Sequence, residues 1–226
     1  QPLFSPNGNQ IAFVRDNNIF LVKLLFNNSE SQVTKDGKLN EIINGLPDWV
    51  NEEEFSWARA FDFSADSKML AWIRYDESKV ASYEFPLYNS VNQGKTGNAQ
   101  QPSKYTYKYP LAGGQNAKVR VQSYDIQSHV TRTLDVPMDS DGYIPRIKFT
   151  STPDQLAIVT LNRHQSSMNI FMGNARSRIC KLALREQNDK YVCDAAYQQL
   201  HFYGNHFVLT SDRNGYKQLY WYSTTG

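Results

Sequence analysis

The sequence predicts an all-β fold: a partial β-propeller that shows roughly four blades of a larger ring, for which we expect eight blades. Three observations support this. One sequence pattern returns four times, helical periodicity is scarce, and 14 Tyr, 12 Phe and 4 Trp occur among 226 residues. Aromatic side chains fill the pleated surface of a sheet well. Since a lone four-stranded sheet cannot bury both faces, sheets of this kind stack radially as blades.

The repeat consists of an aromatic residue, Ser or Thr, a turn rich in Pro, Asp, Asn or Gly, and an apolar strand. Its copies begin at Phe4, Phe63 and Phe149, and a weaker one begins at Phe202. Further strands with an outer-edge pattern follow at 18–22, 168–172 and 218–222. Repeats of about 40–55 residues with several short strands are typical of propeller blades. Because the chain starts inside a repeat, we expect it to be part of a longer protein.

The wide gap between the second and third copies holds a strand pattern of its own at 118–125. Residues 88–109 are polar and predict a long loop between strands. Within them, Lys104 to Tyr109 alternate basic and aromatic residues, which indicates a β-strand before it indicates a nucleic-acid surface. The net charge is only +2, so we expect no nucleic-acid partner.

An acidic segment stands out on this regular background. Glu52, Glu53 and Glu54 are adjacent, and like charges repel by about 1 kcal/mol at ~4 Å even in water. Asp48 can cap a short helix, with the glutamates near its favourable N-terminal end. On that helix Glu53 and Glu54 lie about 100° apart, so both can converge on one ammonium, which has three donors and no acceptor. A solvated acidic helix start explains the same residues.

Cys180 and Cys193 flank a segment that we interpret as two short strands around a polar turn at 186–188. This hairpin would place the thiols opposite one another, so we expect a possible disulfide, which would suit an oxidising compartment. Two unpaired cysteines are the alternative.

Several other chemistries lack their motifs. No G-x-S-x-G nucleophile motif occurs, and no metal-binding cluster of Cys and His is present, so we assign no catalytic residue, metal or cofactor. The histidines are scattered, at His129, His164, His201 and His206.

Four motifs together carry a family resemblance: residues 44–55 around the acidic segment, 107–116, 161–165 and 214–220. The first two are specific, and the likeness covers nearly the whole chain. The sequence resembles the N-terminal β-propeller portion of the dipeptidyl peptidase IV family, which are prolyl oligopeptidase-type serine peptidases.

The resemblance implies that residues 1–226 are part of the propeller domain and that the catalytic α/β-hydrolase domain lies outside this chain. The chain alone should then be inactive, while the whole protein would release X-Pro or X-Ala dipeptides. Glu53 and Glu54 would bind the free amine of the substrate. The family's aromatic wall should fall near 192–202, but Asp194 to Tyr197 depart from its pattern, so no residue is assigned there.

The resemblance also implies partners and a location. The partners are peptides with a free N-terminus, the protein's own hydrolase domain and a second copy in a homodimer; the location is extracytoplasmic. Two alternatives remain open. One is a sibling prolyl tripeptidyl peptidase with the same amine capture, and the other is a non-enzymatic propeller that serves as an interaction scaffold.

Overall fold

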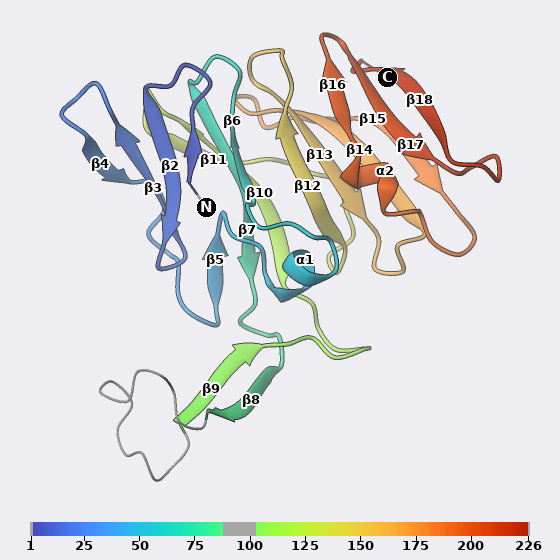
Figure 1. Cartoon of the computed structure of the whole chain (residues 1–226), viewed down its shortest axis with the longest axis horizontal. Coiled ribbons are helices and arrows are strands. Elements are labelled where there is room, and N and C mark those ends of the chain that lie inside the picture. Colours follow the sequence, from blue (N-terminus) through green and yellow to red (C-terminus); the bar gives the residue numbers. More distant parts are fainter. Residues whose placement is uncertain (1, 88–102, 226) are drawn as a thin grey trace.

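The computed structural model describes residues 2–87 and 103–225, which form four antiparallel sheets side by side (Figure 1). A two-stranded hairpin projects from the second sheet. The all-β, partial propeller prediction is confirmed, with four blades in the described part of the chain.

The first sheet contains β1 (Leu3–Phe4), β2 (Gln10–Arg15), β3 (Asn18–Lys23) and β4 (Ser29–Gln32). The second contains β5 (Ile42–Asn44), β6 (Phe61–Phe63), β7 (Met69–Asp76), β10 (Lys118–Asp125) and β11 (Val130–Thr133). The third contains β12 (Tyr143–Phe149), β13 (Gln155–Leu161), β14 (Ser167–Asn174) and β15 (Cys180–Gln187). The fourth contains β16 (His201–Tyr203), β17 (His206–Ser211) and β18 (Gln218–Ser223).

The hairpin that projects, hereafter the arm, consists of β8 (Ser82–Leu87) and β9 (Ser103–Lys108). Two short helices complete the described chain, α1 (Trp49–Glu53) and α2 (Ala195–Gln198). Neither of these helices, within residues 2–87 and 103–225, is long and apolar enough to cross a bilayer.

The repeat pattern corresponds to the first two strands of each sheet. The aromatic residue that opens a copy pairs with the strand that follows: Phe4 with Ile11, Phe63 with Leu70, Phe149 with Leu156 and Phe202 with Phe207. The intervening turn residues make the tight reversal, and the apolar run becomes the second strand.

Two expectations about strands need correction. Segments 18–22 and 168–172 are not outer edges, because β4 and β15 pair beyond them. The strand predicted at 118–125 is confirmed as β10, the third strand of the second sheet, where it pairs with β7. The arm is inserted between these partners and separates them in the sequence. Of the loop expected at 88–109, residues 103–108 form β9, and 88–102 lie outside the described residues.

The hydrophobic core lies between neighbouring sheets. One cluster joins the first and second sheets through Ile19 and Trp72, another joins the second and third through Tyr75 and Ile158, and a third includes Phe207 of the fourth. All five side chains are fully or almost fully buried. The second and third sheets have a neighbour on either side and pack on both faces, and this packing is the radial stacking of blades.

Helix α1 interrupts the first strand of the second sheet. Both β5 and β6 pair with the same edge of β7, and residues 45–60 leave the sheet between them. The excursion is closed by a hydrogen bond of 2.9 Å from the Ala60 nitrogen to the Gly45 carbonyl oxygen. Gly45 has φ +77°, and a Cβ there would lie 3.0 Å from the Ile19 side chain, so the exit requires glycine. The strand β6 also contacts β12 of the third sheet, which places α1 where first strands converge.

Candidate functional site

The acidic helix is held at both ends by buried or aromatic contacts. Asp48 is its N-cap and accepts hydrogen bonds from the backbone and side-chain nitrogens of Asn51, at 3.0 and 2.8 Å. Before the glutamates, the Trp49 ring contacts Tyr109 edge-on at 4.4 Å between centroids. After them, Phe55 is 1% exposed and inserts into the core. The predicted cap at Asp48 is confirmed.

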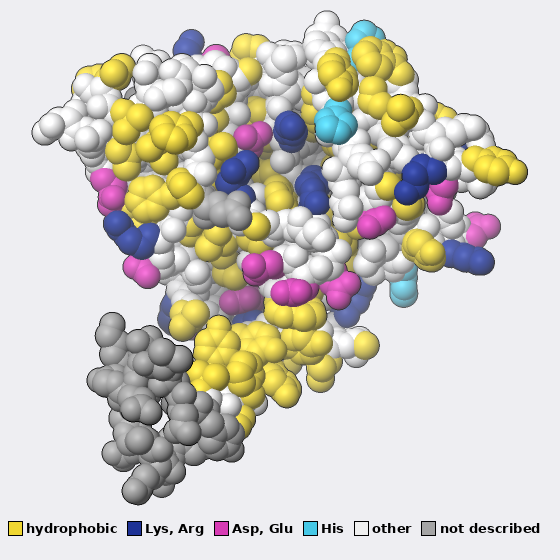
Figure 2. Space-filling model, viewed as in Figure 1, with side chains coloured by type: hydrophobic (Ala, Val, Ile, Leu, Met, Phe, Trp, Pro, Cys, Tyr) yellow, Lys and Arg dark blue, Asp and Glu magenta, His cyan; other side chains and the backbone are white. Residues whose placement is uncertain are grey.

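Glu53 and Glu54 lie between these two anchors, and their side chains are exposed. Neither takes part in an ion pair within the described residues. Figure 2 shows acidic side chains gathered where Figure 1 places α1, at the rim of a hollow that contains Lys and Arg side chains. Two adjacent carboxylates are therefore available to a cation, on a backbone that is fixed from both sides.

The expected position of the pair along the helix was wrong. Because α1 is only five residues long, Glu53 is its last residue and Glu54 its C-cap, so neither lies near the N-terminal end. The partial positive charge of a helix N-terminus acts within the first turn, and only Glu52 lies there. The pair thus gains no stabilisation from the helix dipole.

A group of buried acids lies beneath α1. Burial raises the pKa of Asp48. Burial also holds the pKa of the Tyr75 hydroxyl well above its usual value, and the charge of Asp48 adds to that effect. Burial, assisted by Asp48, raises the pKa of Glu77 to about 7, and Lys108 opposes this shift. Next to the acidic helix, the Tyr75 hydroxyl therefore keeps its proton at neutral pH, and the Glu77 carboxyl group titrates near pH 7.

A cationic side chain connects α1 to the third sheet. Arg146 of β12 donates a hydrogen bond of 2.8 Å from Nη2 to the Phe55 carbonyl oxygen, next to Glu54. Its guanidinium lies 5.3 Å from the Trp57 ring and 5.9 Å from the Tyr197 ring. Burial lowers its pKa, yet an arginine remains charged in proteins. Arg146 thus holds the chain that leaves the glutamate pair.

Tyr197 of α2 also lies beside the segment that carries Glu53 and Glu54. Its ring packs edge-on against Phe55 at 5.7 Å between centroids. Burial raises the pKa of its hydroxyl to about 12, and the nearby carboxylates of Asp194 and Glu54 act in the same direction. The hydroxyl is therefore a hydrogen-bond donor within electrostatic range of Glu54.

Sequence reasoning did not identify Arg146, Trp57 or Tyr197. Arg146 occupies an ordinary position in a strand repeat, and Tyr197 lies in the segment that departs from the family pattern. The one available signal was the expectation of an aromatic wall near 192–202, the segment that contains Tyr197.

The predicted disulfide is absent from the structure, where Cys180 and Cys193 are both free. The expected hairpin does not form, because β15 continues to Gln187, into the expected turn, and no strand follows it at 188–193. Cys180 pairs with Gly173 at one end of β14, while the Val192 nitrogen bonds Gln165 beyond its other end. The thiols therefore lie at opposite ends of β14, about 20 Å apart at the usual rise per residue.

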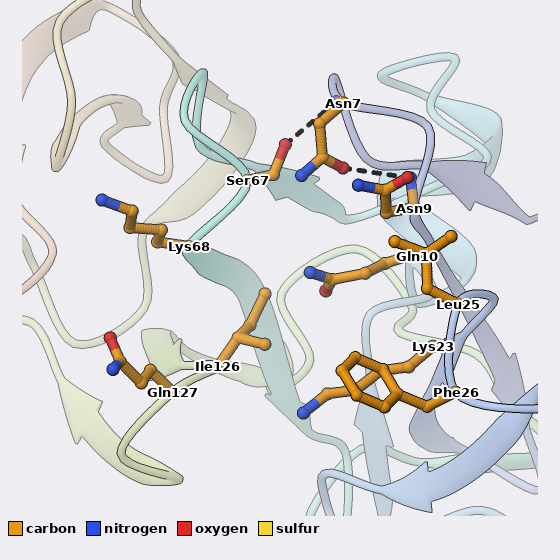
Figure 3. A pocket seen from close by; sticks show the side chains of 10 residues that line it. All are labelled: Asn7, Asn9, Gln10, Lys23, Leu25, Phe26, Ser67, Lys68, Ile126 and Gln127. Carbon is orange, nitrogen blue, oxygen red and sulfur yellow. Dashed lines mark hydrogen bonds between the residues drawn. The ribbon is translucent and has the colours of Figure 1, made fainter.

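Other surfaces of the described chain are separate from α1. A cavity between the first and second sheets is lined by Lys23, Lys68 and several amides, and Ser67 accepts a hydrogen bond of 3.1 Å from the Asn7 nitrogen there (Figure 3). It is formed at the β6–β7 turn. Among the described residues, no group of three or more metal-ligating side chains converges.

The arm carries a ladder of aromatic rings. Tyr83, Phe85, Tyr105, Tyr107 and Tyr109 have neighbouring ring centroids 5.4 to 6.3 Å apart. Hydrophobic side chains cover the visible face of this arm (Figure 2). Because Tyr109 also contacts Trp49, the base of the arm supports the acidic helix.

Comparison with known proteins agrees with this architecture. The family model described as "Dipeptidyl peptidase IV (DPP IV) N-terminal region" matches residues 1–226. The crystal structure of Porphyromonas gingivalis dipeptidyl peptidase 4 superposes with a TM-score of 0.93 at 41% identity, covering 100% of this chain and 31% of that one. Dipeptidyl-aminopeptidase B of Aspergillus niger is 31% identical over 191 residues, which are 81% of this chain and 21% of that protein.

The chain thus spans about a fifth of the length of this curated relative. The family model matches the whole sequence, and the Porphyromonas gingivalis enzyme shares the fold at 41% identity. The chain therefore belongs to the dipeptidyl peptidase IV family and corresponds to the N-terminal region of its members.

Proposed function

We propose that this chain is the substrate-gating propeller portion of a serine exopeptidase that releases X-Pro or X-Ala dipeptides, and that Glu53 and Glu54 bind the free amine of the peptide. The observation that carries the proposal is the pair of exposed carboxylates without an ion-pair partner in the described chain, on a helix inserted into the first strand of a blade. The named relatives are a dipeptidyl peptidase and a dipeptidyl-aminopeptidase, which supports this activity class.

The mechanism follows from positioning. Two carboxylates satisfy an ammonium with charge-assisted hydrogen bonds, which contribute about 1.5–3 kcal/mol each. An amine fixed at α1 would set the distance from the peptide's end to the nucleophile of a hydrolase domain outside this chain. Held geometry of this kind lowers the barrier, and the distance between anchor and nucleophile would select the bond that is cut.

The test uses the whole protein that contains this chain. We expect Glu53→Gln and Glu54→Gln each to lower kcat/KM for an Ala-Pro substrate by roughly 10- to 100-fold, the factor for one charge-assisted bond. Glu52→Gln, on the same exposed helix, is the matched control and should keep its rate. An N-acetylated substrate should resist cleavage. Unchanged kinetics in both variants, or equal cleavage of the acetylated peptide, would refute the amine site.

Product analysis with the whole protein separates the proposed activity from its two alternatives, a tripeptidyl peptidase and an interaction scaffold. A mass spectrum of the products from a Pro-containing peptide distinguishes dipeptide from tripeptide release, and the absence of any release favours an interaction scaffold. The pH dependence is a second check: a peptide amine has a pKa of about 7.7–8, so affinity should fall at higher pH as the amine loses its charge.

The further partners stay proposals. We propose the aromatic arm as the surface that binds a second copy of the chain, because it projects from the second sheet and exposes Tyr83 and Tyr105 at 51% each. The extracytoplasmic location rests on the resemblance alone, since the disulfide that would have supported it is not formed.

A further inference from the structure

A cationic cavity adjoins the acidic helix. It has a volume of about 290 Å³ and lies between β6, β12 and α2. Its lining includes three basic side chains, Arg59, Arg146 and Lys148, and a single carboxylate, Asp62. Figure 2 shows basic side chains in the hollow at this place.

Asp62 does not neutralise this group. Its two carboxylate oxygens accept hydrogen bonds from the backbone nitrogens of Phe63 and Phe149, at 3.0 and 2.9 Å. It forms no ion pair with a basic side chain in the described part of the chain. Asp62 therefore fixes β6 to β12, and the positive charge of the cavity is left without a bonded counterion.

The basic groups also keep unused donors. Arg59 Nε is buried and has no hydrogen-bond partner within the described residues. Arg146 donates to two neutral carbonyl oxygens, those of Pro145 and Phe55, at 2.6 and 2.8 Å. A guanidinium has five N–H donors, and a buried donor without a partner is costly. Such a site is suited to an anion that accepts several hydrogen bonds.

The cavity and the glutamate pair are neighbours. Arg146 bonds the carbonyl of the residue that follows Glu54, and Tyr197 lines the cavity while its hydroxyl lies within electrostatic range of Glu54. In an N-terminal Glu residue the α-nitrogen and the side-chain carboxyl carbon are about 5 Å apart by ordinary bond lengths. One amino acid can thus present an ammonium to one site and a carboxylate to the other.

We propose that Arg59, Arg146 and Lys148 form a carboxylate-binding subsite for the side chain of an acidic first residue of the peptide. This inference rests on the amine site of the proposed function, and it adds a preference for Glu or Asp at the amino terminus. Trp57 and Tyr197 supply the walls that hold Arg146 in place. A guanidinium binds a carboxylate well because the two groups match in planar geometry.

The experiment compares two isosteric substrates, H-Glu-Pro and H-Gln-Pro with the same chromogenic leaving group, on the whole protein. The kcat/KM ratio of Glu to Gln should be about tenfold, near the lower end for a charge-assisted bond. Arg59→Gln and Lys148→Gln should bring this ratio towards one, and Arg59→Lys should retain part of it. Lys181→Gln, an exposed lysine of β15 outside the cavity, is the control and should leave the ratio unchanged.

The outcomes are distinct. A ratio that stays the same in both glutamine variants overturns the subsite, as does an equal loss with both substrates, because that reports only a structural role. If no substrate releases a dipeptide, the proposed activity fails, and calorimetry with Glu-Pro amide and Gln-Pro amide then decides the subsite by itself. Tighter binding of Glu-Pro amide that disappears in Arg59→Gln supports it, and equal binding of the two overturns it.

Discussion

Glu77 gives the clearest physical test of the structure. It directly follows β7, lies within electrostatic range of Asp48, the N-cap of α1, and is 7% exposed. Burial and the Asp48 charge raise its pKa from 4.5 to about 7. Glu77→Gln removes the titrating group and keeps nearly the same shape, so the substitution isolates the cost of ionising a buried carboxyl group.

The sign follows from proton linkage. Between pH 4.5 and pH 7 the folded protein keeps the Glu77 proton and the unfolded chain releases it, so this residue's contribution to stability is full below pH 4.5 and is lost as pH rises through 7. At ~1.36 kcal/mol per pH unit the upper limit is about 3.4 kcal/mol. Because the carboxyl group keeps some contact with water, we expect about 2 kcal/mol.

Hydrogen exchange on the whole protein measures the local opening free energy of the strand next to Glu77. The opening free energies of β7 amides, corrected for the intrinsic effect of pH, should agree between wild type and Glu77→Gln near pH 4, where the unfolded chain also mostly keeps the Glu77 proton. At pH 8 the variant should be more stable by about 2 kcal/mol. Glu52→Gln, an exposed glutamate on α1, controls for surface charge. A difference between Glu77→Gln and wild type that is the same at both pH values would refute the burial argument.

Two further predictions concern the thiols and the arm. Burial raises the pKa of Cys180 to about 11, so its thiolate fraction at pH 8 is roughly 0.1%, and iodoacetamide should modify it slowly in the folded protein. In denaturant without reductant, both cysteines should react fully with iodoacetamide. A disulfide-linked peptide that joins the two cysteines in the mass spectrum would contradict the structure. If the aromatic arm binds a second copy, Tyr83→Lys should shift the whole protein from dimer to monomer in sedimentation, whereas Tyr216→Lys, at 77% exposure outside the arm, should not. A dimer that survives Tyr83→Lys would count against the arm.

Much of the blade architecture was predictable because it is local. An aromatic residue, a turn and an apolar run within a dozen residues are enough to form two paired strands, as at Phe63 and Leu70. The second sheet was harder to predict, since its third strand is separated from β7 by the arm. Strand pairs distant in sequence leave no periodic signal of their partnership.

The cysteines show the same limit. The polar residues 186–188 indicate a turn in isolation, but the strand that precedes them continues to residue 187, and seven of its eight residues pair with β14. Tertiary pairing overrode the local preference, as it often does in strands.

The sequence by itself determined the repeat, the cap at Asp48 and the adjacency of Glu53 and Glu54, because each depends on residues a few positions apart. Only the tertiary structure decided the surroundings of that pair. The short helix leaves both glutamates at its C-terminal end, and the packing of three sheets brings Arg146 and Tyr197 beside Phe55. Side chains from distant segments meet through burial of the core between blades, and that long-range packing cannot be read from local spacing.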